Sequence, residues 1–223
     1  MKPTTNRTNK EHCQDTIAGF IAERLPLTIV PFVPELRVHK AVPTSGLREL
    51  AARDPGFESP YWAHHWGGGL ALARFLIDQP ETVAGRRVLD LGTGSGIVAI
   101  AAKLAGAGDV VAADVDPYAI EALKLNAAAN DVAITTYLGD ITAAGEIPDV
   151  DIVVVGDLFY DRATAGRVTS FLTLCRATGI DVLIGDPRRA FLPGEMEVLA
   201  TYRVSEASGA ENADAKPSSV FRF

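Results

Sequence analysis

Three glycines follow a short apolar segment in the first half of the chain and could form a ligand-binding turn. The segment 88–91 contains one acidic residue, Asp90, and leads into Gly92-Thr93-Gly94-Ser95-Gly96. Glycine lets a backbone turn sharply and approach a ligand closely, and the amides at the start of a following helix can face an anionic or electron-rich group. We therefore expect a cofactor to be held by Asp90, Gly92, Thr93, Gly94 and Gly96.

The spacing of these glycines distinguishes between cofactor classes. A dinucleotide-binding turn would place its third glycine at position 97, which is Ile97, and the Lys-Ser/Thr pair of a phosphate-binding P-loop is missing. Gly-x-Gly-x-Gly after an acidic strand residue is instead typical of methyltransferases that bind S-adenosylmethionine, a ligand with a carboxylate and an ammonium but no pyrophosphate. A plain glycine turn between a strand and a helix is the alternative interpretation.

Two carboxylates at the ends of later predicted strands are candidates for the rest of such a cofactor. Asp114, followed by Val115, comes about 20 residues after the glycines, where a carboxylate can accept both ribose hydroxyls. It could instead cap the next helix, but Asp116 directly precedes Pro117 and is better placed for the cap. Asp140 could accept from the adenine amino group, or it could be an ordinary turn aspartate.

The segment Gly156-Asp157-Leu158-Phe159-Tyr160 follows the fourth predicted strand, and we expect it to choose the substrate. Residues at the carboxyl ends of parallel strands line the ligand crevice. A lysine amine, with a pKa near ~10.4, must lose a proton and aim its lone pair at the methyl group, so Asp157 could orient it while Tyr160 completes a narrow channel. The alternative is an Asp that caps the next helix and a Tyr in the core.

Hydrophobic periodicity predicts an alternation of strands and helices after residue 85. The predicted strands are 87–91, 110–115, 134–138, 152–155, 182–184, 202–206 and 220–223. The predicted helices are 16–25, 47–50 with Ser45 as its cap, 67–78, 97–104, 117–130, 163–177 and 195–200. A weak strand pattern covers 36–40, and the last two strands resemble a hairpin.

Apolar strands that alternate with helices require a mostly parallel sheet covered on both faces. We therefore expect an α/β fold with a Rossmann-like, seven-stranded, mostly parallel sheet, helices on both faces and an antiparallel C-terminal strand. The domain boundaries that we expect are a disordered tail over 1–15, a lid-like extension over 16–59 and the main domain over 60–223.

The composition restricts the partners. The 223 residues carry 21 Lys and Arg against 28 Asp and Glu, a net charge of −7, whereas nucleic-acid binders usually carry a basic stripe. We therefore expect a small-molecule or basic-protein substrate, no nucleic acid and a monomer. No apolar run approaches the roughly 20 residues of a membrane span, and the first residues lack the apolar core of a signal peptide. The two cysteines form no metal-like pair, which fits a reducing cytoplasmic location, or a mitochondrial matrix in a eukaryote.

The ordered motifs together resemble the lysine methyltransferases of the electron transfer flavoprotein beta subunit, within the seven-strand protein lysine methyltransferases marked by Asp/Glu-x-x-Tyr/Phe. The resemblance covers about residues 60 to 223. It rests on Pro60-Tyr61-Trp62-Ala63, Trp66 with Gly68-Gly69, Asp90–Gly96, Asp114–Pro117, Gly156–Asp161, Leu183–Pro187 and Ser219–Phe223. His64-His65 and Arg188 depart from the pattern. The adjacent histidines have no partner at metal-ligand spacing, and we expect no metal.

The resemblance implies an S-adenosylmethionine-dependent protein-lysine N-methyltransferase that acts on the electron transfer flavoprotein beta subunit. It implies that Trp66 packs beside the cofactor with Gly156 and that Trp62 lies near the substrate entrance, although tryptophan is often a core residue. Phe159 and Asp186 would contact the substrate, and Asp186 could equally cap a turn before Pro187. Two alternatives are a methyltransferase of the same fold that acts on a ribosomal protein or small amine, and a nucleotide-binding protein without catalysis.

Overall fold

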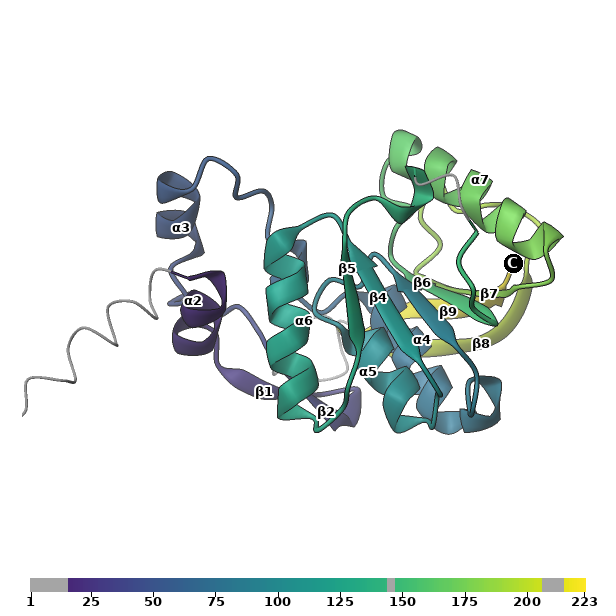
Figure 1. The fold of residues 1–223 in the computed structure, drawn as a ribbon, viewed down its shortest axis with the longest axis horizontal. Helices are drawn as coiled ribbons and strands as arrows, with labels where there is room; N and C mark the ends of the chain where they lie inside the picture. Colours follow the sequence, from purple (N-terminus) through teal and green to yellow (C-terminus); the bar gives the residue numbers. More distant parts are fainter. Residues whose placement is uncertain (1–15, 144–146, 206–214) are drawn as a thin grey trace, which may run out of the picture.

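Seven strands form a single sheet in the order β5-β4-β3-β6-β7-β9-β8 (Figure 1). The computed structural model describes residues 16–143, 147–205 and 215–223, and the predicted tail over 1–15 lies outside them. The strands are β3 Val88–Leu91, β4 Val110–Asp114, β5 Thr135–Leu138, β6 Ile152–Gly156, β7 Asp181–Asp186, β8 Glu197–Val204 and β9 Lys216–Arg222. In the described sheet β9 runs opposite to the other six strands. The predicted seven-stranded, mostly parallel sheet is confirmed.

Helices cover both faces of this sheet, as the apolar strands require. The helices α4 Gly67–Asp78, α5 Ile97–Leu104 and α6 Pro117–Ala129 bury one face, and α7 Arg162–Ala177 buries the other. Successive residues of a strand point to opposite faces, so Val88 packs with α4 and α5 while Leu89 packs with α7. None of the helices in the described ranges is long and apolar enough to cross a membrane.

The start of α4 lies directly against the ends of β6 and β7. A Cβ on Gly68 would be 2.1 Å from the carbonyl oxygen of Gly185, and a Cβ on Gly156 would be 3.1 Å from the Cα of Gly69. Only glycine allows this approach of one backbone to another. The amides of the first turn of α4 are thereby brought to the carboxyl edge of the sheet.

The N-terminal extension lies beside α6, at the left of Figure 1. It contains α2 Ile17–Arg24, the antiparallel pair β1 Leu27–Val30 and β2 Val33–His39, and α3 Leu47–Arg53. The fully buried Asn126 of α6 accepts from the amide of His39 at 2.7 Å and donates to the carbonyl of Ser95 at 2.7 Å. One side chain therefore joins the extension to the loop that follows β3.

Two local predictions are wrong, and one strand was missed. Residues 195–200 were expected to be helical, but they enter the strand β8, because pairing with β9 outweighs the helix preference of Glu, Leu and Ala. The hairpin itself is confirmed. Ser45 does not cap α3: its hydroxyl accepts from Val42 N at 3.0 Å within a turn, and the residue before the helix is Gly46 with φ 74°. The strand β1 was not predicted at all.

Candidate active site

A cavity of about 400 Å³ opens at the carboxyl ends of the central strands. A second cavity of about 60 Å³ adjoins it, and the two share Tyr61, Trp66, Gly92, Gly94, Gly156 and Asp157. The predicted site residues that line the large cavity are Trp62, Trp66, Gly92, Gly94, Asp114, Val115, Asp140, Gly156, Asp157 and Tyr160. Asp90 and Thr93 line the small cavity. The structure thus brings most of the predicted residues to one place.

The glycine loop between β3 and α5 depends on backbone angles that other residues rarely adopt. Gly92, Gly94 and Gly96 have φ values of 68°, 53° and 83°. A Cβ on Gly92 would meet the side chain of Leu158 at 2.6 Å, and one on Gly96 would meet Leu123 at 2.3 Å. Gly96 lines neither cavity, and its backbone packs against Leu123 of α6.

Asp90 holds the loop from beneath. Its Oδ2 accepts from the hydroxyl of Thr93 at 2.6 Å and from the amide of Ala99 at 3.1 Å. Burial raises the pKa of Asp90 to about 7, against the opposing effect of these two hydrogen bonds. A cationic group in the small cavity would favour the ionised carboxylate, because it would replace the hydration that burial removes.

Asp114 and Asp116, at the end of β4, have different roles: Asp114 lines the cavity and Asp116 caps α6. The carboxylate of Asp114 lines the large cavity and accepts from Gly94 N at 2.9 Å and from Asp116 N at 3.0 Å. Burial raises its pKa, and these amides counter the effect. Asp116 is the cap of α6 and accepts from Tyr118 N at 2.8 Å. The expected assignment of the cap to Asp116 is confirmed, and Asp114 is left facing the cavity.

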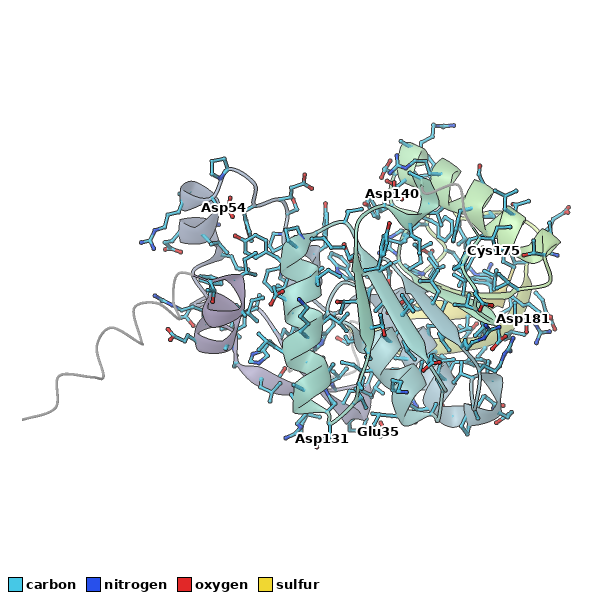
Figure 2. All side chains as sticks on the ribbon, in the orientation of Figure 1. Glu35, Asp54, Asp131, Asp140, Cys175 and Asp181 are labelled. Carbon is cyan, nitrogen blue, oxygen red and sulfur yellow. The ribbon has the colours of Figure 1, made fainter. Side chains whose placement is uncertain are left out.

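Asp140 has the geometry of a turn aspartate and also lines the cavity. Its Oδ1 accepts from the amide of Thr142 at 3.0 Å and from the Thr142 hydroxyl at 2.5 Å, which is the geometry of a turn aspartate. It also lines the large cavity, and its Oδ2 lies 3.8 Å from Arg167 Nε of α7. Figure 2 shows Asp140 above the end of β5, beside α7.

Asp157 is nearly buried and already has hydrogen-bond donors. Its Oδ2 accepts from Gly69 N at 2.6 Å, and its Oδ1 accepts from the guanidinium of Arg189. Burial raises the pKa of Asp157, whereas the charge of Arg189 and the amides of Gly68 and Gly69 oppose that rise. The carboxylate therefore has a fixed direction at the junction of the two cavities.

Aromatic rings border the outer side of the cavity. The ring centroids of Tyr61 and Tyr160 are 5.9 Å apart, and those of Tyr61 and Trp66 are 5.8 Å apart. Tyr160 is 50% exposed and Tyr61 56%, so this border is open to large partners. Trp62 is buried instead, where it stacks on Tyr118 with centroids 6.0 Å apart. Its indole Nε1 has no hydrogen-bond partner among the residues that the structure describes.

Two of the residues expected at the substrate lie elsewhere. Phe159 is completely buried in the core beneath α7, and neither cavity reaches it, because its position in the turn after β6 points it to the opposite face of the sheet. Asp186 is also completely buried and is linked to the cavity through its hydrogen bonds with Arg189. Phe159 is therefore a core residue, and the expectation that it contacts the substrate is corrected.

Several cavity residues were missed by the sequence analysis, including Glu58, Arg167 and Arg189. Arg189 could have been found, because it follows the end of a predicted strand, where the carboxyl edge of the sheet lies. Across residues 16–143, 147–205 and 215–223, no three His, Cys, Asp or Glu side chains are grouped so that they could hold a metal ion.

Comparison with known proteins extends the resemblance. Residues 72–158 match the family model for ribosomal protein L11 methyltransferase (PrmA). The electron transfer flavoprotein beta subunit lysine methyltransferase of Danio rerio is 37% identical over 217 residues, which is 94% of this chain and 84% of the relative.

Solved structures show the same fold at low sequence identity. A Pyrococcus horikoshii protein described as a candidate RNA methyltransferase aligns with a TM-score of 0.54 and 18% identity over 80% of this chain and 98% of that chain. SMU.776 in complex with SAH aligns with a TM-score of 0.50 and 12% identity over 71% of this chain and 50% of that chain. With a methyltransferase fold, and with 37% identity to the relative over nearly its whole length, the chain belongs to the electron transfer flavoprotein beta subunit lysine methyltransferase family.

Proposed function

We propose that the chain transfers a methyl group from S-adenosylmethionine to a lysine side chain of the electron transfer flavoprotein beta subunit. The observation that carries this proposal is the convergence of three features on one cavity: the glycine loop, the carboxylate of Asp114 and the carboxylate of Asp157. The first two suit a nucleoside with an attached amino acid, and the third suits an amine. The relative from Danio rerio bears the name of this substrate.

The residues of the two cavities fit the parts of S-adenosylmethionine. Asp114 would accept from the ribose hydroxyls, and Asp140 would accept from the adenine amino group. The buried Asp90 borders the small cavity, which suits the ammonium of the methionine part. Val115 and Trp66 would pack against the apolar surfaces. When bound, the cofactor supplies an electrophilic methyl group, and the shared border of the two cavities at Asp157 is where we place it.

The open aromatic border suits a lysine side chain. The alkyl stem would pass between Tyr61 and Tyr160, whose ring faces attract a cationic nitrogen. The ammonium first gives its proton to water. The neutral amine would then take up the methyl group that the bound cofactor supplies, so that an N–C bond replaces the S–C bond and S-adenosylhomocysteine is released. Asp157 would orient the amine, and the Tyr160 hydroxyl would complete the polar side of the channel.

The extension over 16–59 is proposed to close the cofactor side of the cavity as a lid. Two contacts support this role. The hydroxyl of Tyr118 donates to Asp54 Oδ2 at 2.5 Å, next to α3, and Trp62 stacks on the same tyrosine while it lines the cavity. Figure 2 shows Asp54 beside α3, on the side of α6 away from the sheet. Lid and cavity wall are thus joined through one side chain.

A ribosomal protein is the second candidate substrate, because the matching family model is that of ribosomal protein L11 methyltransferase. The match covers 72–158, which holds the glycine loop, Asp114 and Asp157 but not Arg189 or the aromatic residues before α4. It therefore bears on the cofactor half of the cavity more than on the substrate half.

The test is methyl transfer with purified components. The chain would be incubated with labelled S-adenosylmethionine and either the electron transfer flavoprotein beta subunit or ribosomal protein L11, and the label would be mapped by mass spectrometry. We expect label on lysine of the flavoprotein subunit and none on a variant in which that lysine is arginine. Label on the ribosomal protein alone would move the assignment to the second candidate. S-adenosylhomocysteine should also raise the melting temperature, and NAD and ATP should not.

A further inference from the structure

Three charged side chains meet behind the proposed methyl-transfer position. Arg189 lies between two carboxylates: its guanidinium donates to Asp157 and, at 3.2 Å, to Asp186 Oδ2. The side chain of Asp157 is 9% exposed, that of Asp186 is 0% exposed and that of Arg189 is 22% exposed. Arg189 also lines the large cavity. We call Asp157, Arg189 and Asp186 the charged triad.

The triad carries more negative than positive charge. Two carboxylates face one guanidinium, so one unit of negative charge is not neutralised by a side chain of the triad. The amides of Gly68 and Gly69, at the start of the 12-residue helix α4, offset it in part through their partial positive charge. A buried charge without a partner is costly, so this site favours a cationic group from the substrate.

The hydrogen bonds of the triad fix the direction of the Asp157 carboxylate. One oxygen accepts from Gly69 N at 2.6 Å, and the other accepts from Arg189. Arg189 is itself held at both ends by Asp186, whose Oδ1 accepts from the Arg189 amide at 2.6 Å. Asp157 also has φ 60°, a backbone conformation that is uncommon outside glycine and persists only where its surroundings enforce it.

We propose that Arg189 is a positioning residue, which holds the Asp157 carboxylate in the direction that a lysine amine needs, and that the negative charge of the triad selects a cationic side chain. The proposal rests on the proposed function, because it assumes that lysine is the acceptor. Arg189 and Asp186 then act through Asp157, while Asp157 and the aromatic border contact the amine. Asp186 is buried, so it contributes through Arg189 without reaching the substrate.

The charged groups around Asp157 determine how the loss of the Arg189 charge should change the pH dependence of methyl transfer. Arg189 comes from the loop after β7, Asp186 from β7 and the two amides from α4, and His64 shares the small cavity with Asp157. Burial raises the pKa of Asp157, and the charge of Arg189 is the largest effect that lowers it. Loss of that charge would therefore raise the pKa further, and methyl transfer would be lost at a higher pH as the solution is acidified.

The variants Arg189→Gln and Arg189→Lys test the positioning role, with Arg188→Gln as the matched control. Arg188 is the neighbouring residue, and its guanidinium lies over the Phe221 ring at 5.1 Å rather than on the carboxylates. We expect Arg189→Gln to bind S-adenosylhomocysteine like the wild type, but to transfer methyl groups about tenfold or more slowly, with the acid limb of kcat shifted to higher pH. Arg189→Lys should recover part of the rate and return the acid limb toward that of the wild type. A wild-type rate and an unchanged acid limb in Arg189→Gln would overturn the proposal.

A second measurement does not depend on the substrate. In Arg189→Gln the buried carboxylate of Asp157 loses its cation, so its pKa in the folded state rises further above its value in the unfolded state. As the pH is raised from about 5 to about 8, the melting temperature of Arg189→Gln should then fall more than that of Arg188→Gln. Equal falls would refute the charge imbalance of the triad. A wild-type enzyme that labels no lysine, combined with the expected difference in melting temperature, would refute the proposed function and leave the triad as a structural feature.

Discussion

Gly68→Ala should lower the melting temperature whereas Gly69→Ala should not, although the two residues are adjacent in α4. A Cβ added at Gly68 would lie 2.1 Å from the carbonyl oxygen of Gly185 and 2.6 Å from its carbonyl carbon. These are backbone atoms of β7, so no side-chain rotation can relieve the contact. Because close C···O contacts in proteins lie at about 3.3 Å, the helix and the strand must separate by roughly 1 Å.

Such overpacking costs about 1–3 kcal/mol, or somewhat more where backbone must move. For a chain of this size each kcal/mol corresponds to roughly 2–4 °C, so the melting temperature of Gly68→Ala should fall by roughly 2–12 °C. The same shift moves the amides of Gly68 and Gly69 away from Asp157, and methyl transfer should fall with it. Cofactor affinity should change less, since the glycine loop belongs to β3 and α5.

The neighbouring substitution is the control. The nearest atoms to a Cβ on Gly69 are Asp157 Oδ2 at 3.7 Å and Val98 Cγ2 at 3.9 Å, which are ordinary contacts. Alanine favours a helix over glycine by up to ~1 kcal/mol, so Gly69→Ala should leave the melting temperature unchanged or raise it. Differential scanning calorimetry measures both variants. Equal melting temperatures, or a lower one for Gly69→Ala, would refute the argument from close packing.

Three further perturbations test the cavity and its surroundings. Asp114→Asn should weaken S-adenosylhomocysteine binding in calorimetry roughly 10- to 150-fold, from the loss of about 1.5–3 kcal/mol in charge-assisted hydrogen bonds, and Asp116→Asn, which keeps its cap, should not; equal affinities would contradict the ribose assignment. Burial lowers the pKa of His65 to about 4, so the melting temperature of the wild type should fall as the pH falls from about 6.5 toward 4. An equal fall in a His65→Gln variant would show that His65 is not the cause. Tyr118→Phe should have a lower melting temperature than the wild type at neutral pH. The Tyr118 hydroxyl lowers the pKa of Asp54, so this difference should narrow as the pH falls and Asp54 becomes protonated. A difference that stays constant with pH would argue against the hydrogen bond.

The main sheet and the cofactor side of the cavity follow from local patterns in the sequence. The strand at 88–91 and the helix at 97–104 are apolar enough to be identified, and the glycines between them leave few structures possible. The division between Asp114 and Asp116 was also predictable, because a residue directly before Pro117 is placed to cap a helix. These predictions depend on neighbours in the chain, which a sequence displays.

The substrate side depends on contacts that no local pattern contains. Arg189 contacts Asp157, which is 32 positions earlier in the chain. The sequence around either residue does not show that the other is its partner. Phe159 lies between two residues that line the cavity, Leu158 and Tyr160, yet its own side chain faces the core. The segment 197–200 is part of a strand because it pairs with β9, although its residue types also favour a helix.

Asn126 makes the N-terminal extension and the glycine loop parts of one cooperative unit. The amide of His39 can exchange its hydrogen with solvent only when its bond to Asn126 opens, and the same side chain holds the carbonyl of Ser95. A ligand that stabilises the loop must therefore slow hydrogen exchange at His39, in a strand that the ligand does not touch. Amide hydrogens of the loop, such as that of Gly94, would in turn exchange faster in a chain without residues 16–40. If the extension opens as a lid, the glycine loop should open with it.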